Sequence, residues 1–307
     1  MTTSTTGTVL VGVDGLPGSA GALRYAVAEA RRRQTELRLL HVVPSLLSLG
    51  PAAPTVDLQR IGAELLADAE RTVRAAAPEL EVHTALTRGE RTGGIVKAAQ
   101  GAQLLVIGRE SRRGIEKLLA GTATASVAAH APCDVVVVPS FWVEADPYGR
   151  VVVGIKSGRD THELLSQAFT EASARGASLE VVTAWHVADL YFDSIEVRTH
   201  ADEWEQHGTE LLVGVTRAWR TAFPDVPVET TVLHGPAARV LLRESSGSDL
   251  LVISRRRFGL PPYGQLGGVG HDLLRLSDVP VHVVPYAADD PELDEELVLE
   301  EAGTAVK

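Results

Sequence analysis

The chain has 307 residues, a length that suits two domains of about 150 residues each. Its net charge is −11, so it lacks the cationic surface that binds phosphate backbones, and we expect no nucleic-acid partner. The single cysteine, Cys133, excludes a disulfide within the chain. No apolar run approaches the ~20 residues that span a bilayer, and residues 1–8 show no secretory signal. We therefore expect a cytoplasmic protein without a membrane partner.

In the first half, short apolar runs alternate with stretches of helical period, as at Ala20, Leu23 and Val27. This alternation predicts an α/β unit in which a mainly parallel, five-stranded sheet has helices on both faces. The basic triplet 31–33 is interpreted as an exposed cap that complements the dipole at the end of the first helix. The predicted strands cover 8–13, 37–43, 81–87, 104–107 and 135–138, and the predicted helices cover 20–33, 58–77, 93–100 and 118–130.

The second half repeats the first. Gly89 and Gly235 are 146 residues apart, and the same offset relates the apolar runs 104–108 and 250–254 and the runs 135–139 and 281–285. Such a duplication predicts two copies of one domain. We place them at residues 1–140 and 149–287. The predicted strands of the second copy begin near Val151, Leu179, Val228, Leu250 and Val281.

Residues 288–307 form a tail of different composition. Between 289 and 301 it carries eight carboxylates and no basic residue. A segment of this kind is typical of a solvated, disordered appendage. We expect no packed structure there.

Three features of the first copy converge at the carboxyl ends of its strands, where ligands bind to open parallel sheets. Asp14 follows the first strand, Gly108 ends the fourth, and 121–124 stand near a helix start. Unpaired N–H groups and hydroxyls at a helix start can hold an anion, and a carboxylate can accept a hydrogen bond from a base or a sugar. Taken singly, the acid is also a common helix cap and the Gly-Thr-x-Thr cluster a common helix start.

The spacing from Gly108 through Ser111 to Gly121 and Thr122 resembles the Gly-x2-Gly-x9-Gly-Ser/Thr signature of universal stress proteins. Residues 11–15, 39–43 and 130–133 match that family as well. The resemblance covers 7–139 and again 149–286, so the chain is identified as a tandem member of the family. It implies two flavodoxin-like, Rossmann-like wound units. One branch of this family binds ATP.

The resemblance also implies a role for each matching position. Asp14 is expected to face the adenine or ribose together with Gly12 and Val42, and Ile107 and Gly108 are expected to line the ribose side. Ser111 departs from the signature, which has glycine there. The expected ligand is ATP, with or without Mg²⁺, although AMP or a cyclic nucleotide stays open. The positions expected to receive the phosphates are Gly121, Thr122, Ala123 and Thr124.

In the second copy this pattern is eroded. Lys156 replaces the acid, and an ammonium group has no hydrogen-bond acceptor. Ser254 and Arg257 replace the two leading positions, and Gly268 and Gly270 replace the two hydroxyl residues. We expect a degenerate site and one bound nucleotide per chain. The alternative is that residues 255–257 and the lysine hold some other anion.

These features leave three classes of function. The leading one is a nucleotide-binding regulatory protein with an unidentified protein partner; the others are a nucleotide-independent interaction scaffold and a slow ATPase or phosphotransferase. We expect no enzyme, because the chain has no P-loop with its lysine. Cys133 is interpreted as an inert core thiol, and His200 and His207, which could share a helix face, lack a third ligand for a metal.

The last strand of each copy is an apolar edge that invites pairing. Relatives of the family dimerise through this strand. We therefore expect 135–138 to pair antiparallel with 281–284 inside one chain, as an intramolecular pseudo-dimer. Whether the chain also forms a homodimer stays open.

Overall fold

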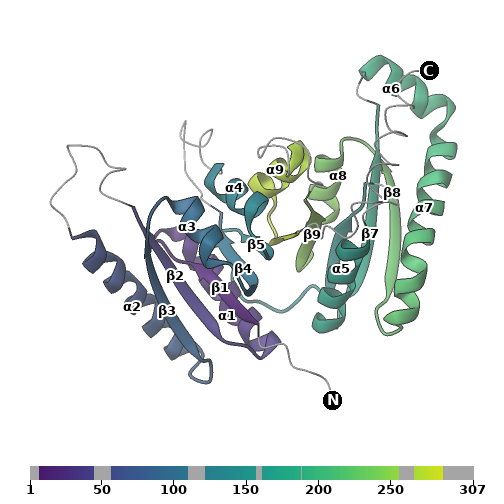
Figure 1. Cartoon of the computed structure of the whole chain (residues 1–307). Helices are drawn as coiled ribbons and strands as arrows, with labels where there is room; N and C mark the ends of the chain where they lie inside the picture. Colours follow the sequence, from purple (N-terminus) through teal and green to yellow (C-terminus); the bar gives the residue numbers. More distant parts are fainter. Residues whose placement is uncertain are drawn as a thin grey trace, which may run out of the picture.

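The computed structural model describes residues 7–44, 57–109, 122–156, 161–187, 189–255 and 266–285, as two α/β halves (Figure 1). The predicted tail, Gly121 and Ser111 lie outside the described residues. The first half contains strands β1 (Thr8–Gly12), β2 (Leu37–Val43), β3 (Val82–Arg88), β4 (Ala102–Gly108) and β5 (Asp134–Val138). Its helices are α1 (Pro17–Arg33), α2 (Leu58–Ala76), α3 (Arg91–Ala98) and α4 (Thr122–His130).

The second half repeats this order and adds one helix. Its strands are β6 (Arg150–Gly154), β7 (Ser178–Trp185), β8 (Val228–His234), β9 (Leu250–Ser254) and β10 (Val281–Val284). Its helices are α5 (His162–Arg175), α6 (Leu190–Thr199), α7 (Ala201–Ala222), α8 (Ala237–Glu244) and α9 (Gly267–Leu276).

All these strands form one ten-stranded sheet in the order β3-β2-β1-β4-β5-β10-β9-β6-β7-β8. Within each half the described pairs are parallel, as predicted. The reversal of strand order between β1 and β4, and between β6 and β9, is the pattern of a doubly wound sheet. The α/β class and the two repeated wound units are therefore confirmed.

Helices cover both faces of the sheet. In β1, Val9 and Val11 pack into a core that includes α1, whereas Leu10 points into the core beneath α4. This alternation follows from the period of two along a strand, and it explains why buried strands in both halves are apolar at nearly every position. Both cores continue from the first half into the second.

The predicted antiparallel pairing of the two last strands is confirmed. Val135 lies opposite Val283, and Val137 lies opposite Val281. Between them the fully buried His282 lies opposite Val136, and its Nε2 is 3.0 Å from an oxygen of Asp134. The two apolar edges therefore satisfy each other inside the chain.

Two arginines at equivalent positions cross this junction in opposite directions. Arg109, directly after β4, donates to the backbone carbonyl of Ser277, and Arg255, directly after β9, donates to that of Ala129 at 2.8 Å. Burial lowers the pKa of both guanidinium groups. Each arginine satisfies a carbonyl at or just beyond the end of a helix in the other half, where the helix dipole favours a positive charge.

The interpretation of 31–33 as an exposed basic cap is wrong for Arg32 and Arg33. Both turn toward α5 and form ion pairs with the buried Glu171, at 2.9 and 2.5 Å. In return, Arg175 of α5 forms an ion pair with the buried Glu29 of α1 at 2.6 Å. Composition alone does not reveal this, because the partner carboxylates lie on two helices that meet only through the sheet junction.

These five charged side chains form what we call the interdomain ion cluster: Glu29, Arg32, Arg33, Glu171 and Arg175. Within α1, Arg33 contacts Glu29, and Arg175 contacts Glu171 one turn back on α5. The two Glu-x3-Arg pairs are 142 residues apart, so the cluster repeats the duplication. Burial acts to raise the pKa of Glu29, but the guanidinium groups of Arg175 and Arg32 hold it well below its usual range.

Several element boundaries also differ from the predictions, and the start of α3 has a clear physical cause. Helix α3 begins at Arg91 rather than 93, because the side chain of Glu90 accepts hydrogen bonds from the N–H groups of Thr92 and Gly93 and so caps it. His200 lies at the junction of α6 and α7 and contacts Glu196, so it does not share a helix face with His207.

Removing one cation from the interdomain ion cluster leaves buried carboxylates without full compensation. We expect Arg175→Ala to lower the free energy of unfolding by about 3 kcal/mol, measured by urea denaturation. The control is Arg60→Ala, which breaks an exposed pair with Glu64 on α2 and should cost less than about 1 kcal/mol. Equal effects of the two substitutions would contradict a buried cluster.

The depressed pKa of Glu29 predicts a pH dependence. An unfolded glutamate binds its proton near pH 4.5, whereas the folded one binds it at lower pH, so its contribution to stability is complete above about 4.5 and is lost as pH falls below it. Glu29→Gln removes that contribution. The difference in unfolding free energy between wild type and Glu29→Gln should therefore shrink in acid. A difference in unfolding free energy that stays constant from pH 7 to about pH 3 would contradict a lowered pKa for Glu29 in the folded protein.

Candidate functional site

The candidate site lies beyond the carboxyl ends of β1 and β4, where the strand order of the first half reverses, and we call this region the crevice. Gly12 ends β1 beside Ile107, the penultimate residue of β4. Among the described residues, a Cβ atom placed on Gly12 would meet one side chain, that of Ile107, at a van der Waals distance of 3.7 Å. Helices α1 and α4, which follow these strands, pack into the cores on opposite faces of the sheet, which is the arrangement that binds ligands in wound sheets.

Asp14 stands at the rim of this crevice in a fixed orientation. One carboxylate oxygen accepts the N–H of Leu16 at 3.0 Å, within a turn that Gly15 completes at a φ of +73°. The other oxygen pairs with the Arg91 guanidinium at 3.0 Å. Each carboxylate oxygen has a second lone pair, so Asp14 can still accept hydrogen bonds from a ligand.

Helix α3 and strand β2 form one wall of the crevice. Val42 is buried there against Gly94, where a Cβ would approach a Val42 methyl to 2.9 Å. His41 of β2 contacts the backbone next to Asp14. Its Nδ1 lies 2.7 Å from the carbonyl oxygen of Val13, so this nitrogen carries the proton and donates. Val42 therefore lines the site as a packed wall.

Gly108 has a packing role that the sequence did not reveal. A Cβ at this position would lie 2.1 Å from the carbonyl oxygen of Gly18, at the start of α1. The close approach of β4 to that backbone therefore requires glycine. The second copy has an exposed serine, Ser254, at the equivalent place.

The helices of this half begin beyond the carboxyl ends of the strands, and the first N–H groups of α3 already have an acceptor. Glu90 occupies the N–H groups of α3, and these hydrogen bonds lower its pKa. Helix α4 begins at Thr122, within the predicted phosphate segment. Ala123 is partly buried and Thr124 is buried, so the Thr124 hydroxyl is less exposed than the predicted phosphate role suggests.

Arg91 was missed by the sequence reasoning. A signal for it existed in the duplication, because residue 237, at the matching position of the second copy, is alanine. The glycines before the two helices fix this match, since Gly89 and Gly235 both have positive φ values, +146° and +135°. The ion pair with Asp14 then makes Arg91 part of the site.

In the second half the equivalent crevice is filled. Leu241 of α8 lies over Gly154, where a Cβ would approach its side chain to 2.8 Å. Leu266 packs against Gly270 in the same way, at 2.7 Å, so no hydroxyl-bearing side chain fits there. Lys156, in place of the acid, is exposed.

The alternative hypothesis is that residues 255–257 and Lys156 hold some other anion. Arg255 does not support it. Arg255 is committed to the carbonyl of Ala129 across the junction, so its charge serves the interface. Arg256 and Arg257 lie outside the described residues.

Cys133 is the cysteine of the chain. Burial raises the pKa of its thiol to about 11, which keeps the thiol protonated and unreactive near neutral pH.

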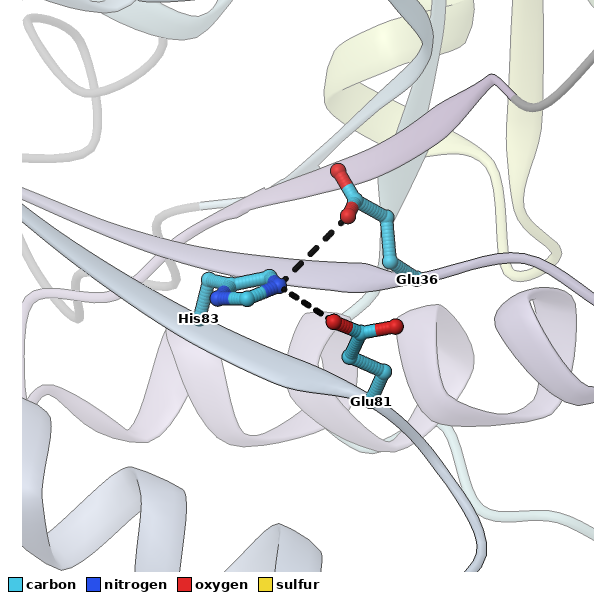
Figure 2. A group of neighbouring side chains, drawn as sticks. All are labelled: Glu36, Glu81 and His83. Atoms are coloured by element: carbon cyan, nitrogen blue, oxygen red, sulfur yellow. Dashed lines mark hydrogen bonds and ion pairs between the residues drawn. The ribbon is translucent and has the colours of Figure 1, made fainter.

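One group of metal-ligating side chains stands out in the described part of the chain, at the amino edge of the sheet (Figure 2). His83 Nε2 lies 3.5 Å from Glu36 and 3.1 Å from Glu81. Glu36 already accepts the Thr8 hydroxyl and pairs with Arg38 at 3.2 Å. The three side chains therefore already have partners within the protein. A hollow of about 730 Å³, lined in part by Thr35, adjoins this group. The hollow and the group lie at the amino ends of the strands, whereas Asp14 lies beyond the carboxyl end of β1.

No helix of the described residues is both long and apolar enough to cross a membrane. The family model described as the universal stress protein family matches residues 5–139 and 147–285. A universal stress protein of Mycolicibacterium smegmatis is 34% identical over 286 residues, covering 90% of this chain and 96% of the relative. One of Mycobacterium tuberculosis is 29% identical over 287 residues, with the same coverage.

The solved structures agree in fold. The crystal structure of a universal stress protein from Archaeoglobus fulgidus covers 93% of this chain and 98% of its own, with a TM-score of 0.69 at 17% identity. A functionally unknown protein from Pseudomonas aeruginosa covers 98% of both chains, with a TM-score of 0.62 at 18% identity. The chain therefore belongs to the universal stress protein family, with two family domains in tandem.

Proposed function

We propose that the first domain of this universal stress protein binds an adenine nucleotide, with ATP as the leading ligand, and that the protein acts as a nucleotide-dependent regulator. The observation that carries the proposal is the fixed carboxylate of Asp14 beside Gly12, where a Cβ would make a single van der Waals contact among the described residues. The duplicated domain supplies an internal comparison, since there Leu241 fills the equivalent space and Lys156 replaces the acid.

The chemistry of the crevice supports a nucleotide that lies with its base against the apolar walls and its phosphates at the start of α4. Its walls at Val42 and Ile107 are buried and apolar, which suits the flat base. The N–H groups at the start of α4 suit phosphate oxygens. Asp14 repels phosphate but accepts hydrogen bonds from the nucleoside.

We propose binding rather than turnover as the activity. Asp14 is engaged by Arg91 and the Leu16 N–H, so it is poorly placed to hold a metal ion or to act as a base. Mg²⁺ would therefore accompany ATP through the phosphates. Cys133 lies buried on the way to β5 and has no part in the site.

The proposal predicts that binding weakens when Asp14 loses its charge and one of its two acceptor oxygens. Asp14→Asn should raise the Kd for ATP about tenfold in calorimetry, because one charged hydrogen bond contributes roughly 1.5 kcal/mol. The matched control is Asp68→Asn on the exposed surface of α2, which should leave the Kd unchanged. Equal Kd values for wild type and Asp14→Asn would disprove the assignment of this carboxylate.

The filled second crevice predicts the stoichiometry. We expect one nucleotide per chain, counted by calorimetry and by mass spectrometry of the intact complex. Leu241→Ala empties the space over Gly154 but leaves Lys156 in place, so the count should stay at one. Two equivalent nucleotides bound to the wild-type chain would show that the second domain retains a working site.

A further inference from the structure

We propose that Arg91 is a specificity-determining residue of the first-domain site, and that the Arg91–Asp14 pair recognises the two hydroxyl groups of a ribose. The inference rests on the proposed nucleotide binding and goes beyond it, because it names the part of the ligand that is read and the side chain that reads it. Its starting point is the 3.0 Å ion pair that joins the end of β1 to the first turn of α3.

The pair belongs to the crevice rather than to the scaffold. Both members are changed in the second domain, to Lys156 and Ala237, although the positive-φ glycines Gly89 and Gly235 before the two helices are kept. The domain that has lost the pair is also the one in which Leu241 fills the crevice. If the ion pair served only to attach α3 to the sheet, α8 would need an equivalent, and its contacts are made by apolar side chains instead.

The hydrogen-bonding chemistry narrows the ligand group. An ionised Asp14 only accepts and Arg91 only donates, and the two are held side by side. A vicinal diol matches this pair, because each hydroxyl donates one hydrogen bond and accepts others. A phosphate matches Arg91 alone and is repelled by Asp14.

Exposure places the sugar rather than the base at this pair. Asp14 is 23% exposed and Arg91 42% exposed, whereas Ile107 and Val42 inside the crevice are buried. The apolar base gains most from the buried walls, and the hydroxyl groups gain most at the partly hydrated rim. Glu90 occupies the N–H groups of α3, so the guanidinium is the donor that this helix offers the sugar.

The test compares ATP with 2′,3′-dideoxy-ATP, which keeps the base and the phosphates and lacks both hydroxyls. The full-length wild-type protein should bind ATP at least tenfold more tightly than the dideoxy analogue, by calorimetry. Arg91→Ala should raise the Kd for ATP about tenfold and change that for the analogue by less than about threefold. Arg91→Lys, which keeps the charge but not the planar fork, should give an intermediate ratio.

Arg60→Ala, which removes an exposed arginine from α2, is the control and should leave both Kd values unchanged. An Arg91→Ala protein whose two Kd values rise by the same factor would show a general effect of charge and overturn the ribose assignment. Wild-type protein that binds both nucleotides equally would also overturn it, while leaving nucleotide binding intact. Wild-type protein that binds neither would remove the proposed function and this inference together.

Discussion

The antiparallel ladder between β5 and β10 is the constraint on which the arrangement of the two domains depends. Each strand alone would be an apolar sheet edge with unpaired backbone groups, and pairing them converts two five-stranded units into one continuous sheet. Because the two units are copies, antiparallel pairing relates them by an approximate twofold axis. Contacts across the junction then occur in matched sets, as with Arg109 and Arg255.

The interdomain ion cluster follows from the same geometry. The axis brings the last turns of α1 and α5 together, so Glu29 and Arg175 meet at the same time as Glu171 and Arg33. Burying such charges is costly, and only a complete set of partners offsets the cost. A different register of the two domains would break the pairs between α1 and α5 and leave each carboxylate with only the arginines of its own helix. The cluster therefore acts on the specificity of the arrangement as much as on its stability.

Much of this fold could be predicted from the sequence, because apolar runs, helical periods and the duplication are local signals. The 37–43 strand and the paired last strands match the structure, whereas the helix predicted at 93–100 spans Arg91–Ala98 and begins earlier because Glu90 caps it. The predictions that failed depend on contacts between residues that are far apart in the sequence. Arg32 and Arg33 pair with Glu171, on a helix about 140 residues away in the sequence. Arg91 belongs to the site because the folded chain brings the start of α3 next to Asp14. The phosphate segment is only partly covered, since Ser111 and Gly121 lie outside the described residues.

The two domains differ at the crevice, whereas the arginines that span their junction are kept. In the second domain Lys156 replaces the acid and Leu241 lies over Gly154, yet Arg255 still spans the junction as its counterpart Arg109 does. Other junction positions differ between the copies, since Val136 matches His282 and Ala174 matches Arg32. Arg109 directly follows Gly108, so the chain that leaves β4 toward the predicted phosphate segment is anchored on the second domain. The second domain thus holds the end of β4, the strand that carries Ile107 and Gly108. Because this contact is made by the junction and not by the crevice, the second copy can differ at its crevice and still position the first domain.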